Sequence, residues 1–170
     1  MKLTRRFRSV NTIKLLLTDA EAKGRAAGES HAGAEHLLLA ALDLPDGLGR
    51  RALVAAGADP DAVGPAIEAE HDDALRAIGV EPVAIEPTAP PPPSGPLLTG
   101  ASAQAAFRRA AELSRADRRL GLTGAHVVLA VAEMEHGTAA RALRRLGVDG
   151  AALRAAARAE LDRAGGAPRT

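Results

Sequence analysis

Residues 33–40 read Gly-Ala-Glu-His-Leu-Leu-Leu-Ala, and a degraded copy of this stretch, Thr-Gly-Ala-His-Val-Val-Leu-Ala, occupies residues 123–130. The two stretches lie ninety residues apart, and the register continues beyond them without a gap. The residues that recur at this offset include these pairs: Gly47 and Gly137, Arg51 and Arg141, Leu53 and Leu143, Gly57 and Gly147, Asp59 and Asp149, and Glu70 and Glu160. A fixed offset over this length predicts a duplicated helical unit.

The composition favours helices over strands. Hydrophobic residues make up 46% of the 170-residue chain, and almost all are Ala, Leu and Val, with two Phe and no Trp or Tyr. Strands favour aromatic and β-branched side chains, so we expect an all-α fold. A single repeat of roughly sixty-five residues would be marginally stable, so the two repeats should pack together as one pseudo-two-fold domain.

Repeat 1 is expected within residues 1–78, where an irregular basic arm at residues 1–8 precedes four helices. Asn11 would cap the first helix, and Ser30 would cap the second, which carries the repeated stretch. The fourth helix would begin at Asp59-Pro60, because a capping residue followed by proline suits the first helical turn.

Residues 79–98 differ from the rest of the chain in composition. They contain seven prolines, four of them consecutive, which cannot continue a helix and predict a stiff, extended linker. A proline-rich ligand for a peptide-binding module is the alternative. Repeat 2 should then cover residues 99–164, with Thr123 capping a helix that runs through Met134, and residues 165–170 should form a frayed tail.

The repeated stretch, the Asp-Gly turn at 46–47 and the Gly-x-Asp ending at 57–59 together resemble the N-terminal repeat domain of Clp unfoldases. The resemblance covers residues 7–164 and implies two repeats of four helices each. In that family the domain precedes ATPase modules and recruits substrates or adaptors. Because this chain stops at Thr170, the resemblance implies the recruiting domain by itself.

The resemblance also implies a binding site. In related domains the signature Glu forms an acidic pocket with a Thr from the start of the preceding helix, and some members hold a guanidinium or phosphoarginine group there. The signature Glu corresponds to Glu35 in repeat 1 and to Ala125 in repeat 2. The family's other motif positions are filled as follows: Ala34 and Gly124 at the signature Thr, and Phe7-Arg8 and Leu98-Thr99 at the Phe-Thr opening. Neither repeat keeps both the Glu and the opening Thr.

We therefore expect ligand or partner contacts from Glu35, Arg8, Ala34 and Thr99. A competing interpretation is that Glu35 only complements the dipole of its helix. The remaining signature residues should be structural: Gly33, His36, His126, Gly47 and Gly137. For the two histidines, hydrogen bonds that anchor helix packing are expected in preference to a role as bases.

Enzymatic motifs are missing from the sequence. The three lysines do not follow glycine as an ATP-binding loop requires, and no Gly-x-Ser-x-Gly motif surrounds a serine. Glu133 and His136 are three residues apart, a spacing at which two metal ligands can share a helix face. The two histidines of a zinc protease motif are missing, so we attribute this spacing to chance and expect no metal or cofactor. A non-catalytic protein is the prediction.

The charge is nearly balanced, with 22 basic and 21 acidic residues. This balance makes nucleic acid an unlikely partner, because phosphate neutralisation supplies much of that affinity. The alternative is a small helical regulator that binds nucleic acid through its arginine clusters: Arg5, Arg6 and Arg8; Arg108, Arg109, Arg115, Arg118 and Arg119; and Arg141, Arg144 and Arg145.

Neither a cysteine nor an apolar run long enough for a membrane span is present in the sequence, so a cytoplasmic protein is expected. The expected partners, which rest on the resemblance, are Clp unfoldase or protease components and their adaptors or substrates. The protein would act as an adaptor, regulator or decoy of Clp proteolysis. Macrocyclic peptides or phosphoarginine-type groups are the small ligands that the resemblance implies.

Overall fold

The structure is a computed structural model that describes residues 2–82 and 99–166, without the side chains of residues 2–9. Most of the predicted linker at 79–98 thus lies outside the described residues. The regular secondary structure of these residues is helical, apart from one isolated bridge between Ala32 and Thr99, which confirms the all-α prediction. The elements are α1 (Lys2–Ala26), α2 (Ala34–Leu42), α3 (Leu48–Ala55), η1 (Pro60–Ala62), α4 (Val63–Ala77), α5 (Ala101–Asp117), α6 (Gly124–Ala132), α7 (Thr138–Arg145) and α8 (Gly150–Gly166).

The ninety-residue register persists in the helices. Adding ninety to the bounds of α2 gives the bounds of α6, and the same sum converts α3 into α7. The short 3₁₀ turn η1 and α4 together correspond to α8, which is continuous. Pro60 begins η1 at the position where Gly150 begins α8, after the caps Asp59 and Asp149.

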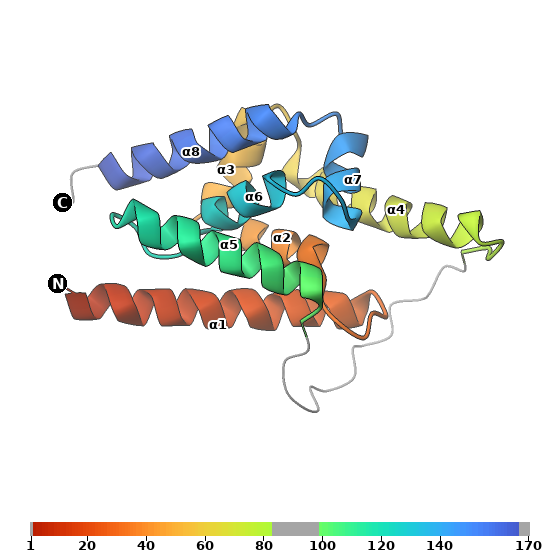
Figure 1. Cartoon of the computed structure of the whole chain (residues 1–170), viewed down its shortest axis with the longest axis horizontal. Helices are drawn as coiled ribbons and strands as arrows, with labels where there is room; N and C mark the ends of the chain where they lie inside the picture. Colours follow the sequence, from red (N-terminus) through yellow and green to blue (C-terminus); the bar gives the residue numbers. More distant parts are fainter. Residues whose placement is uncertain (1, 83–98, 167–170) are drawn as a thin grey trace.

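The signature helices lie at the centre of the molecule. In Figure 1, α1 runs along one edge and α8 along the opposite edge, with α2, α3 and α6 between them and α4 projecting at one end beside α7. Side chains predicted to point inward are buried in these central helices, among them Leu37 and Leu38 on α2 and Val127 and Val128 on α6. The core therefore joins the two repeats.

Two equivalent ion pairs connect the repeats in opposite directions. Arg51 on α3 places Nε 3.0 Å from Glu160 Oε2 on α8, and Arg141 on α7 places Nε 2.9 Å from Glu70 Oε2 on α4. These are ninety-residue counterparts, so each repeat supplies the arginine of one pair and the glutamate of the other. Arg145 adds a second contact to Glu70, and together the two guanidiniums hold the pKa of that carboxyl below its usual value.

The start of α6 packs against repeat 1 at very short range. A β-carbon added at Gly124 would lie 2.6 Å from the Ala41 carbonyl oxygen, and one added at Gly49 would lie 3.0 Å from the same oxygen. Asp46 fixes this contact, because its carboxylate accepts from the N–H of Leu48 at 2.8 Å and of Gly124 at 3.0 Å. Burial raises the pKa of Asp46 despite these two hydrogen bonds.

Several predicted helix ends are wrong. The arm expected at residues 1–8 is helical from Lys2, since no glycine or proline interrupts the chain before Gly24, and Asn11 lies inside α1 instead of capping it. Gly33, not Ser30, caps α2, and the Ser30 hydroxyl contacts His31 instead. In repeat 2, α6 ends at Ala132, so Met134 lies in the following turn. Helix α8 continues to Gly166, beyond the expected start of the tail, and residues 167–170 lie outside the description.

The short contact at Gly124 gives a stability prediction. Gly124→Ala should lower the free energy of unfolding by about 2 kcal/mol, because the new methyl group meets a backbone oxygen that can move only with its helix. Gly150→Ala is the matched control: Gly150 also begins its helix, but its added β-carbon would have 3.4 Å to the nearest atom. The control should be neutral or stabilising, by about 0.5 kcal/mol. Urea denaturation of both variants measures the difference, and equal effects would contradict the steric explanation.

Candidate ligand-binding site at the start of α2

The signature histidines close the first turn of α2 and α6 in the same way. His36 Nδ1 accepts from the Gly33 N–H at 3.0 Å, and His126 Nδ1 accepts from the Thr123 N–H at 3.2 Å, with the Thr123 hydroxyl at 2.8 Å. Both imidazoles are buried. A histidine three residues after the cap thus satisfies a backbone donor that the helix leaves free. This geometry is that of a structural histidine and not of a base open to a substrate.

Burial lowers the pKa of both histidines, and that of His126 falls to about 4. Protonation would place a hydrogen on Nδ1, where a backbone N–H already points, so the capping bond favours the neutral ring. The proton of the neutral ring then sits on Nε2. In His126 this atom is buried 3.7 Å from Asp117 Oδ2, and neither atom has a hydrogen-bond partner among the described residues.

Glu35 lies in the first turn of α2 and folds back over Gly33. Its Oε1 would be only 2.1 Å from a β-carbon placed at Gly33, so the carboxylate occupies the space that a side chain there would take. The residue is 9% exposed. His36 Nδ1 lies 3.4 Å from Glu35 Oε1, but it already accepts a hydrogen bond from Gly33 and has no proton to offer. Among the side chains that the structure describes, which exclude those of residues 2–9, no lysine or arginine lies within ion-pair distance of Glu35.

The start of α5 forms the second wall of this site. The Gly100 N–H donates to the Ala32 carbonyl at 2.8 Å, next to the bridge between Ala32 and Thr99. The Ala34 N–H donates to the Ser102 hydroxyl at 3.1 Å. These bonds hold the first turns of α2 and α5 together, so the start of repeat 2 lies beside the helical turn that carries Glu35.

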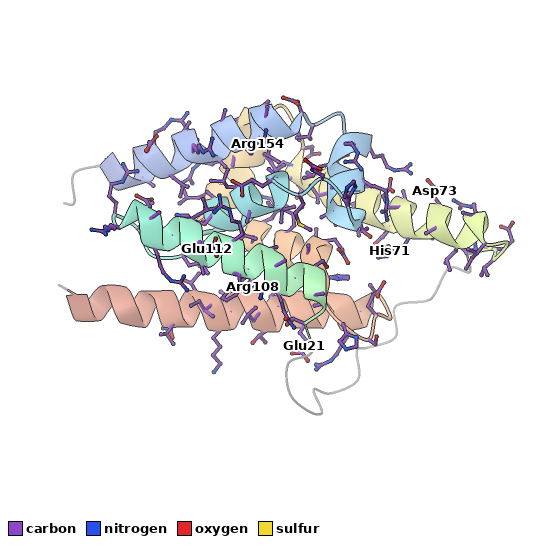
Figure 2. All side chains as sticks on the ribbon, in the orientation of Figure 1. Glu21, His71, Asp73, Arg108, Glu112 and Arg154 are labelled. Carbon is purple, nitrogen blue, oxygen red and sulfur yellow. The ribbon has the colours of Figure 1, made fainter. Side chains whose placement is uncertain are left out.

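A third side comes from α4 and the loop before α2. His71 on α4, labelled in Figure 2, places Nε2 3.9 Å from Glu29 Oε1. Both groups lie close enough to His36 to act on it electrostatically, as does Lys23: Glu29 raises the pKa of His36, whereas His71 and Lys23 lower it. Lys23 is itself paired with Asp43 at 2.7 Å. The corner therefore contains two carboxylates, Glu29 and Glu35, at the amino end of a helix. We refer to this site as the Glu35 corner: Glu35 in the first turn of α2, the start of α5 with Thr99 and Ser102, and the side formed by His71 and Glu29.

The equivalent place in repeat 2 has no such carboxylate. Ala125 stands where repeat 1 has Glu35 and is fully buried, and the Gly124 N–H is taken by Asp46. The two repeats therefore differ in chemistry at the same point of the same fold, and the Glu35 corner belongs to repeat 1.

The structure brings three of the four predicted binding residues together. Glu35, Ala34 and Thr99 lie at the corner, whereas for Arg8 only the helical backbone is described. Ser102 was missed by the sequence reasoning. A signal for it exists, because a hydroxyl recurs at the ninety-residue offset as Thr12 and Ser102.

Four of the arginines that cluster in the sequence form ion pairs with acids in the structure: Arg109, Arg119, Arg141 and Arg145. The pairs of repeat 2 are Arg109 with Glu133, Arg119 with Asp117 and Asp162, Arg141 and Arg145 with Glu70, and Arg163 with Glu160. Within residues 2–82 and 99–166, no group of three or more acidic or histidine side chains could hold a metal ion. No helix in the same ranges is long and apolar enough to cross a membrane.

Comparison with known proteins identifies the fold. The sequence model of one protein family, the Clp repeat (R) N-terminal domain, matches residues 10–87 and 99–168, and the chain belongs to this family. Among solved structures, it is similar to the N-terminal domain of the caseinolytic protease associated chaperone ClpD from Arabidopsis thaliana. That similarity has a TM-score of 0.55 at 22% identity and covers 91% of this chain and 92% of the other. A search of curated proteins found no match.

The two buried histidines predict a stability loss in acid. The unfolded pKa near 6.5 exceeds the folded pKa of His126, about 4, so the unfolded chain binds the proton more readily between these values. The contribution of His126 is complete above pH 6.5 and is lost as the pH falls towards 4, by on the order of 3 kcal/mol.

The measurement is urea denaturation at a series of pH values on the wild type and on His126→Asn, whose amide oxygen can replace Nδ1 as an acceptor without titrating. The variant should show a flatter dependence between pH 6.5 and 4. Parallel curves for the two proteins would contradict the assignment of this loss to His126.

Proposed function

We propose that this protein is a non-catalytic binding module that uses the Glu35 corner to take a cationic group on a protein partner. The observation that carries the proposal is the Glu35 carboxylate itself. It is mostly buried and lacks a basic partner in the described part of the chain, yet the exposed Ser102 lies at its edge. A carboxylate in such a place is stabilised by an added guanidinium or ammonium group.

Family membership supports the kind of partner. The matched family is defined by an N-terminal domain of Clp proteins, and the similar solved structure is the N-terminal domain of a protease-associated chaperone. We infer that this chain binds Clp unfoldase or protease components, or their adaptors or substrates. In that role it acts as an adaptor, regulator or decoy of Clp proteolysis.

Phosphoarginine is the modified group that fits the corner best. A guanidinium would pair with Glu35, while the attached phosphate would face the amino end of α2 and the hydroxyls of Thr99 and Ser102. Ser102 accepts from the Ala34 N–H, which leaves its own proton free to be donated. Macrocyclic peptides remain an expectation from the family resemblance alone.

Ion pairs within the protein weaken the case for the nucleic-acid alternative. Arg109, Arg119 and Arg141 already contact carboxylates, so binding DNA phosphates would require those ion pairs to break. We therefore keep protein binding as the single proposed function.

The test is a pull-down from native cytoplasm with the tagged protein, read by mass spectrometry, for the wild type, Glu35→Gln and Gly33→Ala. Enrichment of Clp components, adaptors or substrates is expected for the wild type and at least about tenfold less for Glu35→Gln, which loses a charge-assisted contact. Gly33→Ala should weaken binding similarly, because its methyl group displaces the Glu35 side chain without removing it. The backbone at Gly33 has φ −90°, which alanine can adopt, so this variant should stay folded.

Asp162→Asn is the matched control, because Asp162 is an exposed acid on α8, which packs against α3 and α6 and does not form a side of the corner. It should bind like the wild type. Retained enrichment in Glu35→Gln, combined with a loss of about 1 kcal/mol in unfolding free energy, would show that Glu35 serves only to stabilise its helix.

A further inference from the structure

A cavity of about 290 Å³ lies in repeat 2, where the end of α6, α7 and the beginning of α8 meet. It is separate from the Glu35 corner and shares no lining residue with it. Its volume is at the low end of the range for small-molecule sites, roughly 300–1,000 Å³, so it has room for one residue-sized group. The ligand must therefore be small, or must be the end of a larger molecule.

The floor of the cavity is apolar. Val131, Leu143, Val148 and Leu153 line it and are at most 7% exposed. Met134 also lines it and is partly exposed, whereas its counterpart in repeat 1, Leu44, is 3% exposed. The floor thus offers an apolar surface on which an inserted aliphatic side chain would exclude water.

The charged groups around the cavity are three carboxylates and two guanidiniums. Glu133 is held by Arg109 through contacts of 2.6 and 3.2 Å, and Asp149 accepts from the Ala152 N–H at 2.9 Å. Arg144 and Arg154 donate only to main-chain oxygens, those of Glu135 at 3.1 Å and Ala132 at 2.9 Å. Neither forms an ion pair with a carboxylate among the described residues, although Arg154 lies within the field of Glu133.

Arg154 lies over the first turn of its own helix. Its Nη1 would be 3.4 Å from a β-carbon at Gly150, the first residue of α8, and Figure 2 labels the side chain on this helix. A cation at the amino end of a helix is unfavourably placed with respect to the helix dipole. Asp149 already caps the Ala152 N–H of this turn, so an anion bound there would interact favourably with the guanidinium and with the N–H groups of Gly150 and Ala151.

We propose that this cavity binds the C-terminal residue of a polypeptide when that residue is aliphatic. The side chain would fill the apolar floor, and the terminal carboxylate would accept from Arg144 and Arg154. The exposed Glu135 carboxylate provides an acceptor for the peptide N–H of the same residue. The chain would leave through the open side of the cavity, so a protein of any length could be held by its end.

The test uses the full chain and an N-terminally fluorescein-labelled decapeptide of polar residues that ends in leucine, followed by fluorescence anisotropy. The peptide with a free carboxylate should bind at least about tenfold more tightly than the same peptide with a C-terminal amide. A peptide ending in aspartate should also bind at least about tenfold more weakly, because it cannot fill the floor. Equal affinities for the acid and the amide would overturn the proposal, and so would the absence of any binding by the peptide with a free carboxylate.

Three variants locate the site. Arg154→Gln should weaken binding about tenfold or more, while Arg158→Gln, one turn further along the same helix and outside the cavity, should not. Ala140→Leu fills the cavity from α7 and should abolish binding without lowering Tm, which separates loss of the site from loss of the fold. Wild-type affinity in Ala140→Leu would overturn the assignment. Glu35→Gln should bind the peptide normally, so the outcome is independent of the function proposed for the Glu35 corner.

Discussion

Helices α3 and α6 come from different repeats and meet with almost no space between their backbones. Gly49 and Gly124 make this approach possible, and the Asp46 carboxylate holds it by accepting from the N–H of the first residue of each helix, Leu48 and Gly124. The counterpart contact between α2 and α7 has Ala34 and Ala139 at the same positions, both buried, so it contains two methyl groups that the first contact lacks. The pseudo-two-fold symmetry is therefore imperfect at the centre of the molecule. The close contact at Gly49 and Gly124 fixes the amino end of α6 against repeat 1.

This asymmetry extends to the chemistry of the two helix starts. At the start of α6 the backbone donor is taken by a carboxylate from the other repeat, and the signature acid is replaced by the buried Ala125. At the start of α2 a hydroxyl from the other repeat takes that donor, and Glu35 stays in place without a basic partner in the described part of the chain. The neutral Ser102 hydroxyl does not compete with Glu35 for an incoming cation, whereas a carboxylate such as Asp46 in that place would. The two ends thus have the same backbone but different capacities to bind.

The internal repeat was sufficient to predict the fold, because the apolar stretches that form α2 and α6 recur at a fixed offset and are almost entirely buried. His36 was found through its recurrence as His126, and Glu35 through the family resemblance. The helix starts were harder, since Asn11 and Ser30 have capping chemistry but lie where tertiary contacts place the cap elsewhere. Ser102 and the cavity in repeat 2 depend on packing between segments distant in sequence, and composition contains no direct signal for such contacts. The ion pairs of Arg51 and Arg141 could be predicted only in part. The sequence shows that these arginines and the glutamates recur at the ninety-residue offset, but only the structure shows that each pair joins the two repeats.

The crossed pairs have a consequence for the history of the molecule. Because each repeat contributes the arginine to one pair and the glutamate to the other, two separate copies of a single repeat would form both contacts by simple two-fold symmetry. A homodimer built that way must carry identical residues at both helix starts, so any substitution at one appears at the other. Joining the copies in one chain removes that coupling. Fusion is what allows a protein of this design to keep an acid at one end and lose it at the other.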